Sequence, residues 1–473
     1  LTVAEGLADL VDAETDAQRR QAVNQMSGVF GRTCDAWRQV LLEARSLAEA
    51  AIDFSDESDV AADAFARARA IEAGKGPIIE IDASGVTAGD PNGLTLTSGA
   101  STVRGLVIHS ADDNAIEIDV NADGSVIVGN YLGTDVSGTK ALGNSSDGPY
   151  GALGIKADGV IVGGTTVADR NLISGNLGYG IEIYSSATGA VIRGNTIGTT
   201  VDGSAALGNA TGGIYIWNGA ANNTIGGAAA NEGNLIASNS GDGVWVGATA
   251  GAGNAILGNT IYSNTGLAID LGANGVTAND TNDGDSGAND LLNFPVVTKV
   301  VQNGANLDVT LVLDVPAGNY RIELYQNPAG IDATRYGEGQ VFLGALSITS
   351  AGGAQTYTGT LTGVTATSIT RISATATRDL GAGSYGSTSE FGPRAGLVVS
   401  TTADTIDGTT TSVAALISNP GADGQISLRE AITAANATAG ADTIYFDITA
   451  ALAGGVHTIT LAYDGADAGT TPD

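Results

Sequence analysis

The chain has 473 residues with 69 glycines, one cysteine and a formal net charge of −31. So acidic a composition argues against nucleic acid as a partner, because phosphate binding needs clustered Lys and Arg, and the single Cys34 excludes an internal disulfide framework. We expect no membrane span, because no run of 18 or more apolar residues occurs, and a hydrophobic fraction of 43% is enough for several packed domains.

Residues 1–73 are predicted to be helical, because they are rich in Ala, Leu, Glu and Arg and poor in glycine. Thr2 and Glu5 have the spacing of a capping box. Apolar residues then follow at helical spacing, at Leu7, Leu10 and Val11. Amphipathic helices need a partner surface, so we expect them to cover the open end of the next segment, near Ile79, Ile81 and Leu94.

Two phrases in this segment carry a family resemblance. Residues 6–22 read GLADLVDAETDAQRRQA, and residues 50–57 read AAIDFSDE. Over about residues 1–66 the chain resembles the helical domain of the tRNA-modification GTPase MnmE. The family's phosphate loop, G-x-x-x-x-G-K-[ST], and its Cys-Ile-Gly-Lys ending do not occur in the sequence. The resemblance therefore implies a helical segment without its GTPase domain, joined near residues 66–77 naturally or artificially.

Residues 76–292 repeat a strand phrase in which Gly or Ala is followed by Ile, any residue and Ile, with Gly-Asn turns after most copies. The copies begin at Ala115, Gly154, Gly180, Gly213, Gly243 and Ala268. Strand repeats of roughly 20–30 residues are typical of solenoids. The pattern resembles bacterial right-handed parallel β-helix proteins. We expect the alternating Ile and Val to stack inward and each Gly-Asn to supply a left-handed turn residue.

Residues 293–396 change to the two-residue period of antiparallel strands and predict an Ig-like β-sandwich. Residues 397–473 hold one helix, with Ser427 as N-cap and Glu430 three residues later, and then a strand at residues 442–447. This segment resembles the CSLREA segment that precedes β-helices in bacterial surface or secreted proteins, which implies a truncated second β-helix. The predicted fold class is mainly β: a right-handed parallel β-helix with N-terminal α-helices and a C-terminal antiparallel β-sandwich.

Outward positions of the strand phrase are predicted to form two columns, because adjacent strands lie about 4.8 Å apart. The first column holds Glu117, Lys156, Glu182, Tyr215, Trp245 and Asp270, and the second holds Asp119, Asp158, Tyr184 and Trp217. The candidate ligand-binding face for glycans consists of Glu182, Tyr184, Tyr215, Trp217, Trp245 and Asp270. Sugar rings stack on aromatic faces and their hydroxyls bond to carboxylates. The alternative is aromatic pairing between strands with no ligand.

We expect no cofactor; the loop at residues 279–290 is a weak candidate for a metal site, for Ca²⁺. Its oxygen donors would be Asp280, Asn282, Asp283, Asp285 and Asp290. The alternative is a turn that closes the solenoid. We assign no catalytic residue, although paired carboxylates such as Glu182 and Asp270 could cleave a glycosidic bond.

The sequence as a whole predicts a non-enzymatic fragment of a modular extracellular or cell-surface protein, with a structural, adhesive or glycan-binding role. Its partners would be a polysaccharide or cell-surface glycan and neighbouring repeats of a longer chain, with no nucleic acid. No signal peptide is visible at Leu1. Two alternatives stay open: a β-helix polysaccharide hydrolase or lyase, and a role related to the tRNA-modification GTPase for the N-terminal segment alone.

Overall fold

The computed structural model describes residues 77–461, apart from 78, 87–90, 147, 149, 273–274, 329–333 and 453–454. The chain divides into two compact units, Leu1–Gly76 and Pro77–Asp473. The predicted helices of residues 1–73, and their expected contact with the first strands, lie outside the described residues.

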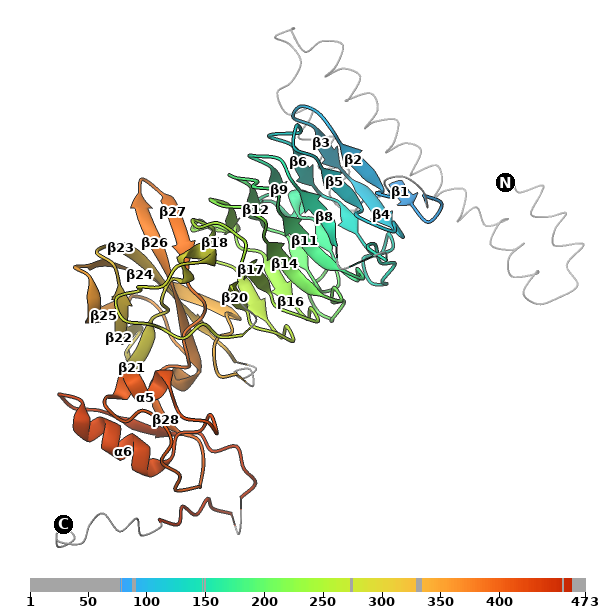
Figure 1. The fold of residues 1–473 in the computed structure, drawn as a ribbon. Helices are drawn as coiled ribbons and strands as arrows, with labels where there is room; N and C mark the ends of the chain where they lie inside the picture. The colour runs from blue at the N-terminus through green and yellow to red at the C-terminus, as the bar shows by residue number, and fades with distance from the viewer. Residues whose placement is uncertain are drawn as a thin grey trace, which may run out of the picture. The chain divides into compact units, whose positions relative to one another are not determined.

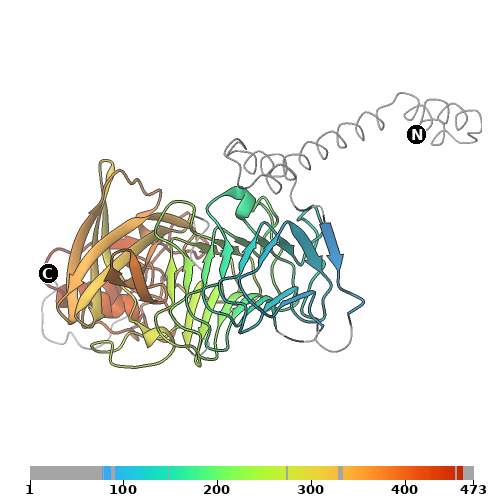
Figure 2. The ribbon, with the colours of Figure 1, turned by 90° about the horizontal axis from the view of Figure 1, so that it is seen from above.

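The first part of the second unit consists of three parallel sheets, which the chain visits in rotation (Figures 1 and 2). The first sheet contains β1 (Ile79–Asp82), β4 (Leu106–His109), β7 (Tyr131–Leu132), β10 (Leu172–Ile173), β13 (Thr196–Ile197), β16 (Leu235–Ala237) and β19 (Thr260–Tyr262). The second contains β2 (Leu94–Leu96), β5 (Ile116–Ile118), β8 (Gly151–Ile155), β11 (Tyr179–Ile183), β14 (Gly212–Ile216), β17 (Val244–Gly247) and β20 (Ile269–Gly272). The third contains β3 (Thr102–Arg104), β6 (Val126–Val128), β9 (Ile161–Gly163), β12 (Val191–Arg193), β15 (Thr224–Gly226) and β18 (Ala255–Leu257). Each circuit of the chain therefore adds one strand to each sheet.

The core between the three sheets is built from the alternating aliphatic residues of the strand phrase. In the second sheet, Ile181 pairs in register with Ile214, and Ile183 pairs with Ile216. All four side chains are fully buried. Full burial of an aliphatic side chain of this size contributes about 1.5–3 kcal/mol, so the stacked columns are the main source of stability. The prediction that Ile and Val stack inward is confirmed for these strands.

The Asn residues of the Gly-Asn turns form two buried ladders. One ladder comprises Asn130, Asn171, Asn195, Asn234 and Asn259, and the other comprises Asn144, Asn176, Asn209, Asn239 and Asn264. Within each ladder the side-chain Nδ2 of one Asn donates to Oδ1 of the next, at 2.8–3.2 Å. At six of the ten positions the residue before the Asn is left-handed, as at Gly194 (φ 65°) and Ser238 (φ 63°). A Cβ atom at Gly194 would lie 2.0 Å from the carbonyl oxygen of Gly164, so glycine is required there.

Two antiparallel sheets follow and share a hydrophobic core. The three-stranded sheet contains β21 (Val296–Asn303), β22 (Asn306–Val315) and β25 (Gly353–Leu361). The four-stranded sheet contains β24 (Val341–Ser350), β23 (Gly318–Gln326), β26 (Ile372–Gly381) and β27 (Ser384–Thr388). Short 3₁₀ helices lie at η1 (Val167–Asp169), η2 (Ala288–Leu291) and η3 (Ile369–Arg371). Together with the parallel sheets, these strands confirm that the described part of the chain is mainly β.

The last described segment holds α5 (Val413–Ser418), α6 (Leu428–Ala437) and the parallel pair β28 (Leu397–Val399) and β29 (Ile444–Phe446). The predicted capping box at α6 is confirmed. The Ser427 hydroxyl accepts the Glu430 N–H at 3.2 Å, and the Glu430 carboxylate accepts the Ser427 N–H at 2.8 Å. Among the described helices, none is long and apolar enough to cross a membrane.

Three glutamates, one in β23 and two in the connections that follow β23 and β27, accept N–H groups at the last strands of the parallel sheets. Glu323 accepts the N–H of Gly258, beside β18, at 2.8 Å. Glu338 accepts the N–H of Ser263, beside β19. Glu390 accepts the N–H of Leu271, in β20, at 2.9 Å. Each of the three parallel sheets therefore ends on a carboxylate, which satisfies an edge donor that another chain could otherwise pair with.

Candidate functional site

The outer face of the second parallel sheet gathers most of the predicted ligand-binding residues. Glu182 pairs in register with Tyr215, Tyr215 with Trp245, and Trp245 with Asp270. Tyr184 and Trp217 follow directly after β11 and β14 and lie beside them on the same face, since their rings stack. The structure thus brings all six predicted residues of this face together.

Two predicted positions in the columns are wrong, that of Lys156 in the first column and that of Asp158 in the second. The partner of Glu117 and of Glu182 on β8 is Gly154, and not Lys156. The phrase that aligns with the neighbouring strands begins at Ala152, two residues earlier than predicted. A shift of two residues keeps the same face, so Lys156 still points outward, beside Tyr184 in the second column.

The aromatic rings form a continuous stack. Ring centroids are 4.4 Å apart for Tyr215 and Trp245, 4.9 Å for Tyr179 and Tyr215, and 5.6 Å for Tyr184 and Trp217. Tyr215 also stacks on Trp217 at 5.7 Å, with the planes only 3° apart. Parallel strands hold successive outward side chains at about the stacking distance of aromatic rings, so the fold itself aligns the stack. We call the surface formed by these rings together with Glu117, Glu182, Asp242 and Asp270 the aromatic–acidic ridge. It runs from Glu117 on β5 to Asp270 on β20.

Glu182 lies beneath the rings and is 4% exposed. Its Oε2 accepts the N–H of Gly151 at 2.9 Å. Burial raises the pKa of Glu182 to about 7, and the nearby charge of Asp113 raises it further. The carboxyl therefore changes its charge near neutral pH.

Two more carboxylates lie at the far end of the ridge. Asp270 is fully buried, and its Oδ2 accepts the N–H of Gly275 at 3.0 Å, while its Oδ1 has no hydrogen-bond partner among the described residues. Burial raises the pKa of Asp270 to about 7, and the charge of Asp242 raises it further. Asp242 accepts the N–H of Leu267 at 2.7 Å, and its pKa is also raised, chiefly by burial.

At the Glu117 end of the ridge, a basic side chain, Lys156, already lies between a carboxylate and an aromatic ring. The ammonium group of Lys156 bonds to Oε1 of Glu117 and lies 5.5 Å from the ring centroid of Tyr184. The other oxygen of Glu117, Oε2, accepts from Asn92 at 3.0 Å, and Glu117 is 6% exposed. Glu117 and Lys156 therefore form a single, largely buried ion pair.

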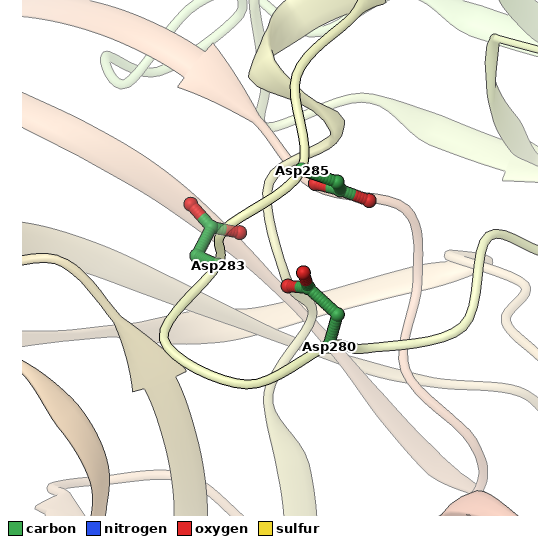
Figure 3. A group of neighbouring side chains, drawn as sticks. All are labelled: Asp280, Asp283 and Asp285. Carbon is green, nitrogen blue, oxygen red and sulfur yellow. The ribbon is translucent and has the colours of Figure 1, made fainter.

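The candidate metal loop is only partly assembled as predicted. Carboxylate oxygens of Asp280, Asp283 and Asp285 lie within 4.8 Å of one another (Figure 3). The other two predicted ligands bond elsewhere. The N–H of Asn282 donates to Asp314 at 3.1 Å, and Oδ2 of Asp290 accepts from Ser387 at 2.5 Å. Oδ1 of Asp283 accepts the N–H of Asn293 at 2.7 Å. A backbone N–H therefore already binds one of the carboxylate oxygens that a metal ion would need.

The sequence pattern missed Tyr179, Asp242 and Asp113 as members of this region. Tyr179 lies two residues before the inward Ile181, and a two-residue period therefore assigns it to the core, yet its ring stacks outside on Tyr215. Asp242 and Asp113 lie just before strands, where the phrase carries no information.

The comparisons with known proteins concern the other end of the chain. The profile of the MnmE helical domain matches residues 1–86. Three similar relatives, each named tRNA modification GTPase MnmE, come from Methylobacterium sp. (strain 4-46), Beijerinckia indica subsp. indica and Maricaulis maris. They are 63% identical over 60 residues, 56% over 71 and 58% over 60. These matches cover 13–15% of this chain and 14–16% of the relatives. The resemblance of residues 6–22 and 50–57 to that domain is confirmed.

These matches correct the function predicted from the sequence. The relatives are named for the modification of tRNA, which contradicts a secreted or cell-surface fragment with an adhesive, structural or glycan-binding role. The same finding contradicts three further predictions. These are the polysaccharide partner, the exclusion of nucleic acid and the extracellular location. The error has a physical source: a net charge of −31 is a sum over the whole chain and conceals a short segment rich in arginine.

Proposed function

We propose that this chain takes part in tRNA modification through residues 1–86, acting as a helical-domain module of the MnmE type. The observation that supports the proposal is the profile match to that segment, with 63% identity over 60 residues to the Methylobacterium protein. GTP hydrolysis is not part of the proposal, because the phosphate-loop motif does not occur in the 473 residues.

Arginines are denser in the N-terminal segment than in the rest of the chain, and they are the side chains that would contact tRNA. A large share of the chain's 20 basic residues lies there, namely Arg19, Arg20, Arg32, Arg38, Arg45, Arg67, Arg69 and Lys75. The same segment also holds 14 acidic residues, so residues 1–76 have a net charge of −6 and the case for tRNA contact depends on the arginines and not on net charge. Phosphate neutralisation by Lys and Arg dominates nucleic-acid affinity, so contact should be confined to residues 1–86.

We also propose that the three parallel sheets are the coils of a right-handed β-helix and that the antiparallel sheets form a sandwich. The rotation of the chain through the three sheets supports the first assignment, and the shared core supports the second. For residues 397–473, the capping box of α6 and the strand β29 that follows support the CSLREA-like assignment.

The test is binding of fluorescently labelled tRNA to the full chain, measured by anisotropy at low and at high salt. We expect binding that weakens steeply as salt is raised, because phosphate contacts release counterions. Arg19→Glu together with Arg20→Glu should weaken binding at least tenfold. The matched control is Lys140→Glu, an exposed basic residue between β7 and β8, which should have no effect. Absence of binding at low salt, or an equal loss in the control, would overturn the proposal.

A further inference from the structure

The surroundings of Lys156 indicate which chemical group the aromatic–acidic ridge accepts. An ammonium group there is held by a carboxylate, Glu117, and faces an aromatic ring, Tyr184. A cation over a ring face is attracted by the negative face of the ring, and partial burial strengthens both contacts. The combination selects a nitrogen cation with some apolar surface, and not a bare metal ion, which would need several oxygen ligands.

The same combination recurs further along the ridge without a basic side chain. Glu182 lies in register with Tyr215, and Asp270 lies in register with Trp245. Among the described residues, neither Glu182 nor Asp270 forms an ion pair with Lys, Arg or His; the one ion pair on this face is that of Lys156 with Glu117. The ridge thus offers two further carboxylate–aromatic positions whose charge the described part of the protein leaves uncompensated.

A buried polar atom at one of these positions also points to a missing partner. Asp270 is 0% exposed, and its Oδ1 has no hydrogen-bond partner, although unpaired buried carboxylate oxygens are costly. It shares the outward column with Trp245, so this oxygen belongs to the ridge and not to the aliphatic core. A donor-rich ligand would satisfy the carboxylate.

We propose that the aromatic–acidic ridge binds a linear organic polycation, whose ammonium groups lie at Glu182 and Asp270 and whose methylene chain runs over Tyr215 and Trp245. Three strand spacings separate Glu182 from Asp270, which is about 14 Å. An extended polyamine can span that distance, whereas a single small cation cannot occupy both positions. This inference concerns a different part of the chain from the proposed function and does not depend on it.

The experiment is a titration of the full chain with spermidine, in a Trp37→Phe background. The remaining tryptophans are then Trp217 and Trp245, both on the ridge, so a change in tryptophan fluorescence reports on this surface. Calorimetry gives the affinity independently. Triethylene glycol, a neutral chain of similar length, and MgCl₂ serve as control probes. We expect spermidine to bind and to change the fluorescence, and the two controls to do neither.

Two variants test the assignment of positions. Glu182→Gln removes the charge but keeps the shape of the side chain and an oxygen that can accept the N–H of Gly151. It should weaken spermidine binding about tenfold. Trp245→Leu, which removes the ring, should act similarly. Asp123→Asn, at an exposed turn after β5, is the matched charge control and should leave the affinity unchanged.

Three results would overturn the inference. The first is equal binding of triethylene glycol, which would indicate a neutral ligand. The second is spermidine binding that Asp123→Asn weakens as much as Glu182→Gln does, which would indicate diffuse attraction to an acidic surface. The third is absence of a fluorescence change at saturating spermidine. Melting temperatures of the variants close to that of the parent show that the fold is intact.

Discussion

The asparagine ladders offer the sharpest test of what holds the parallel sheets together, and Asn195 is the central member of one ladder. Its Oδ1 accepts both the N–H and the Nδ2–H of Asn171, at 3.2 and 2.9 Å. Its Nδ2 donates to Val162 O and to Asn234 Oδ1, both at 3.0 Å. Asn195 is 1% exposed, so water cannot replace these partners.

Replacing Asn195 with alanine should therefore leave two buried donors and a buried carbonyl without partners. An unsatisfied buried group costs about 1–3 kcal/mol, so the three groups together give a loss of roughly 3–9 kcal/mol in the free energy of unfolding. The assay is urea denaturation of the full chain, followed by far-ultraviolet circular dichroism. Asn121→Ala is the matched control, because Asn121 is exposed and should change stability by less than about 0.5 kcal/mol. A loss below about 1 kcal/mol for Asn195→Ala would refute the reasoning.

Three further predictions concern charge, capping and metal. Because burial raises the pKa of Glu182 and Asp270 to about 7 and that of Glu390 to about 8, the folded chain retains protons that the unfolded chain has already released at a lower pH. Stability should therefore fall as pH rises from about 5 to 8, and Glu390→Gln should flatten that fall; a melting temperature that is constant across this window would contradict the assignment. Ser427→Ala should cost about 1 kcal/mol in the free energy of unfolding, and an unchanged urea midpoint would show that the α6 cap contributes nothing. Millimolar Ca²⁺ should raise the melting temperature, and Asp283→Asn should abolish that rise; no response in the parent chain would remove the loop as a metal site.

The sequence predicts the repeated strand phrases well, because their period is enforced by burial. Ile181 and Ile183 must alternate inward, so a two-residue pattern finds both them and the outward Glu182 between them. It fails where the strands are irregular. At β8 the glycine pattern does not distinguish Gly154 from Ala152, and the predicted register is therefore two residues late.

The ladders and the carboxylates that protect the last strands could not be predicted from the sequence. A Gly-Asn pair reads as a turn, and nothing local reveals that the Asn side chain is buried against the next coil. Glu323, Glu338 and Glu390 lie 65 to 119 residues from the N–H groups they accept. Contacts across such separations depend on how the antiparallel sheets dock, and no sequence period encodes that arrangement.

Function was harder to predict than fold because the residues that indicate the fold and the residues that indicate the function lie in different parts of the chain. The strand phrases dominate the sequence, whereas the match to the MnmE helical domain covers residues 1–86. The identities of 56–63% to the Beijerinckia and Methylobacterium relatives outweigh an inference from net charge.

Ultraviolet crosslinking of tRNA to the full chain, with the attached peptides identified by mass spectrometry, tests the proposed function most directly. The account predicts crosslinked peptides within residues 1–86, lost when Arg19 and Arg20 are changed to glutamate. Crosslinks that fall mainly on the strands of residues 94–272, or that survive the two substitutions unchanged, would contradict it.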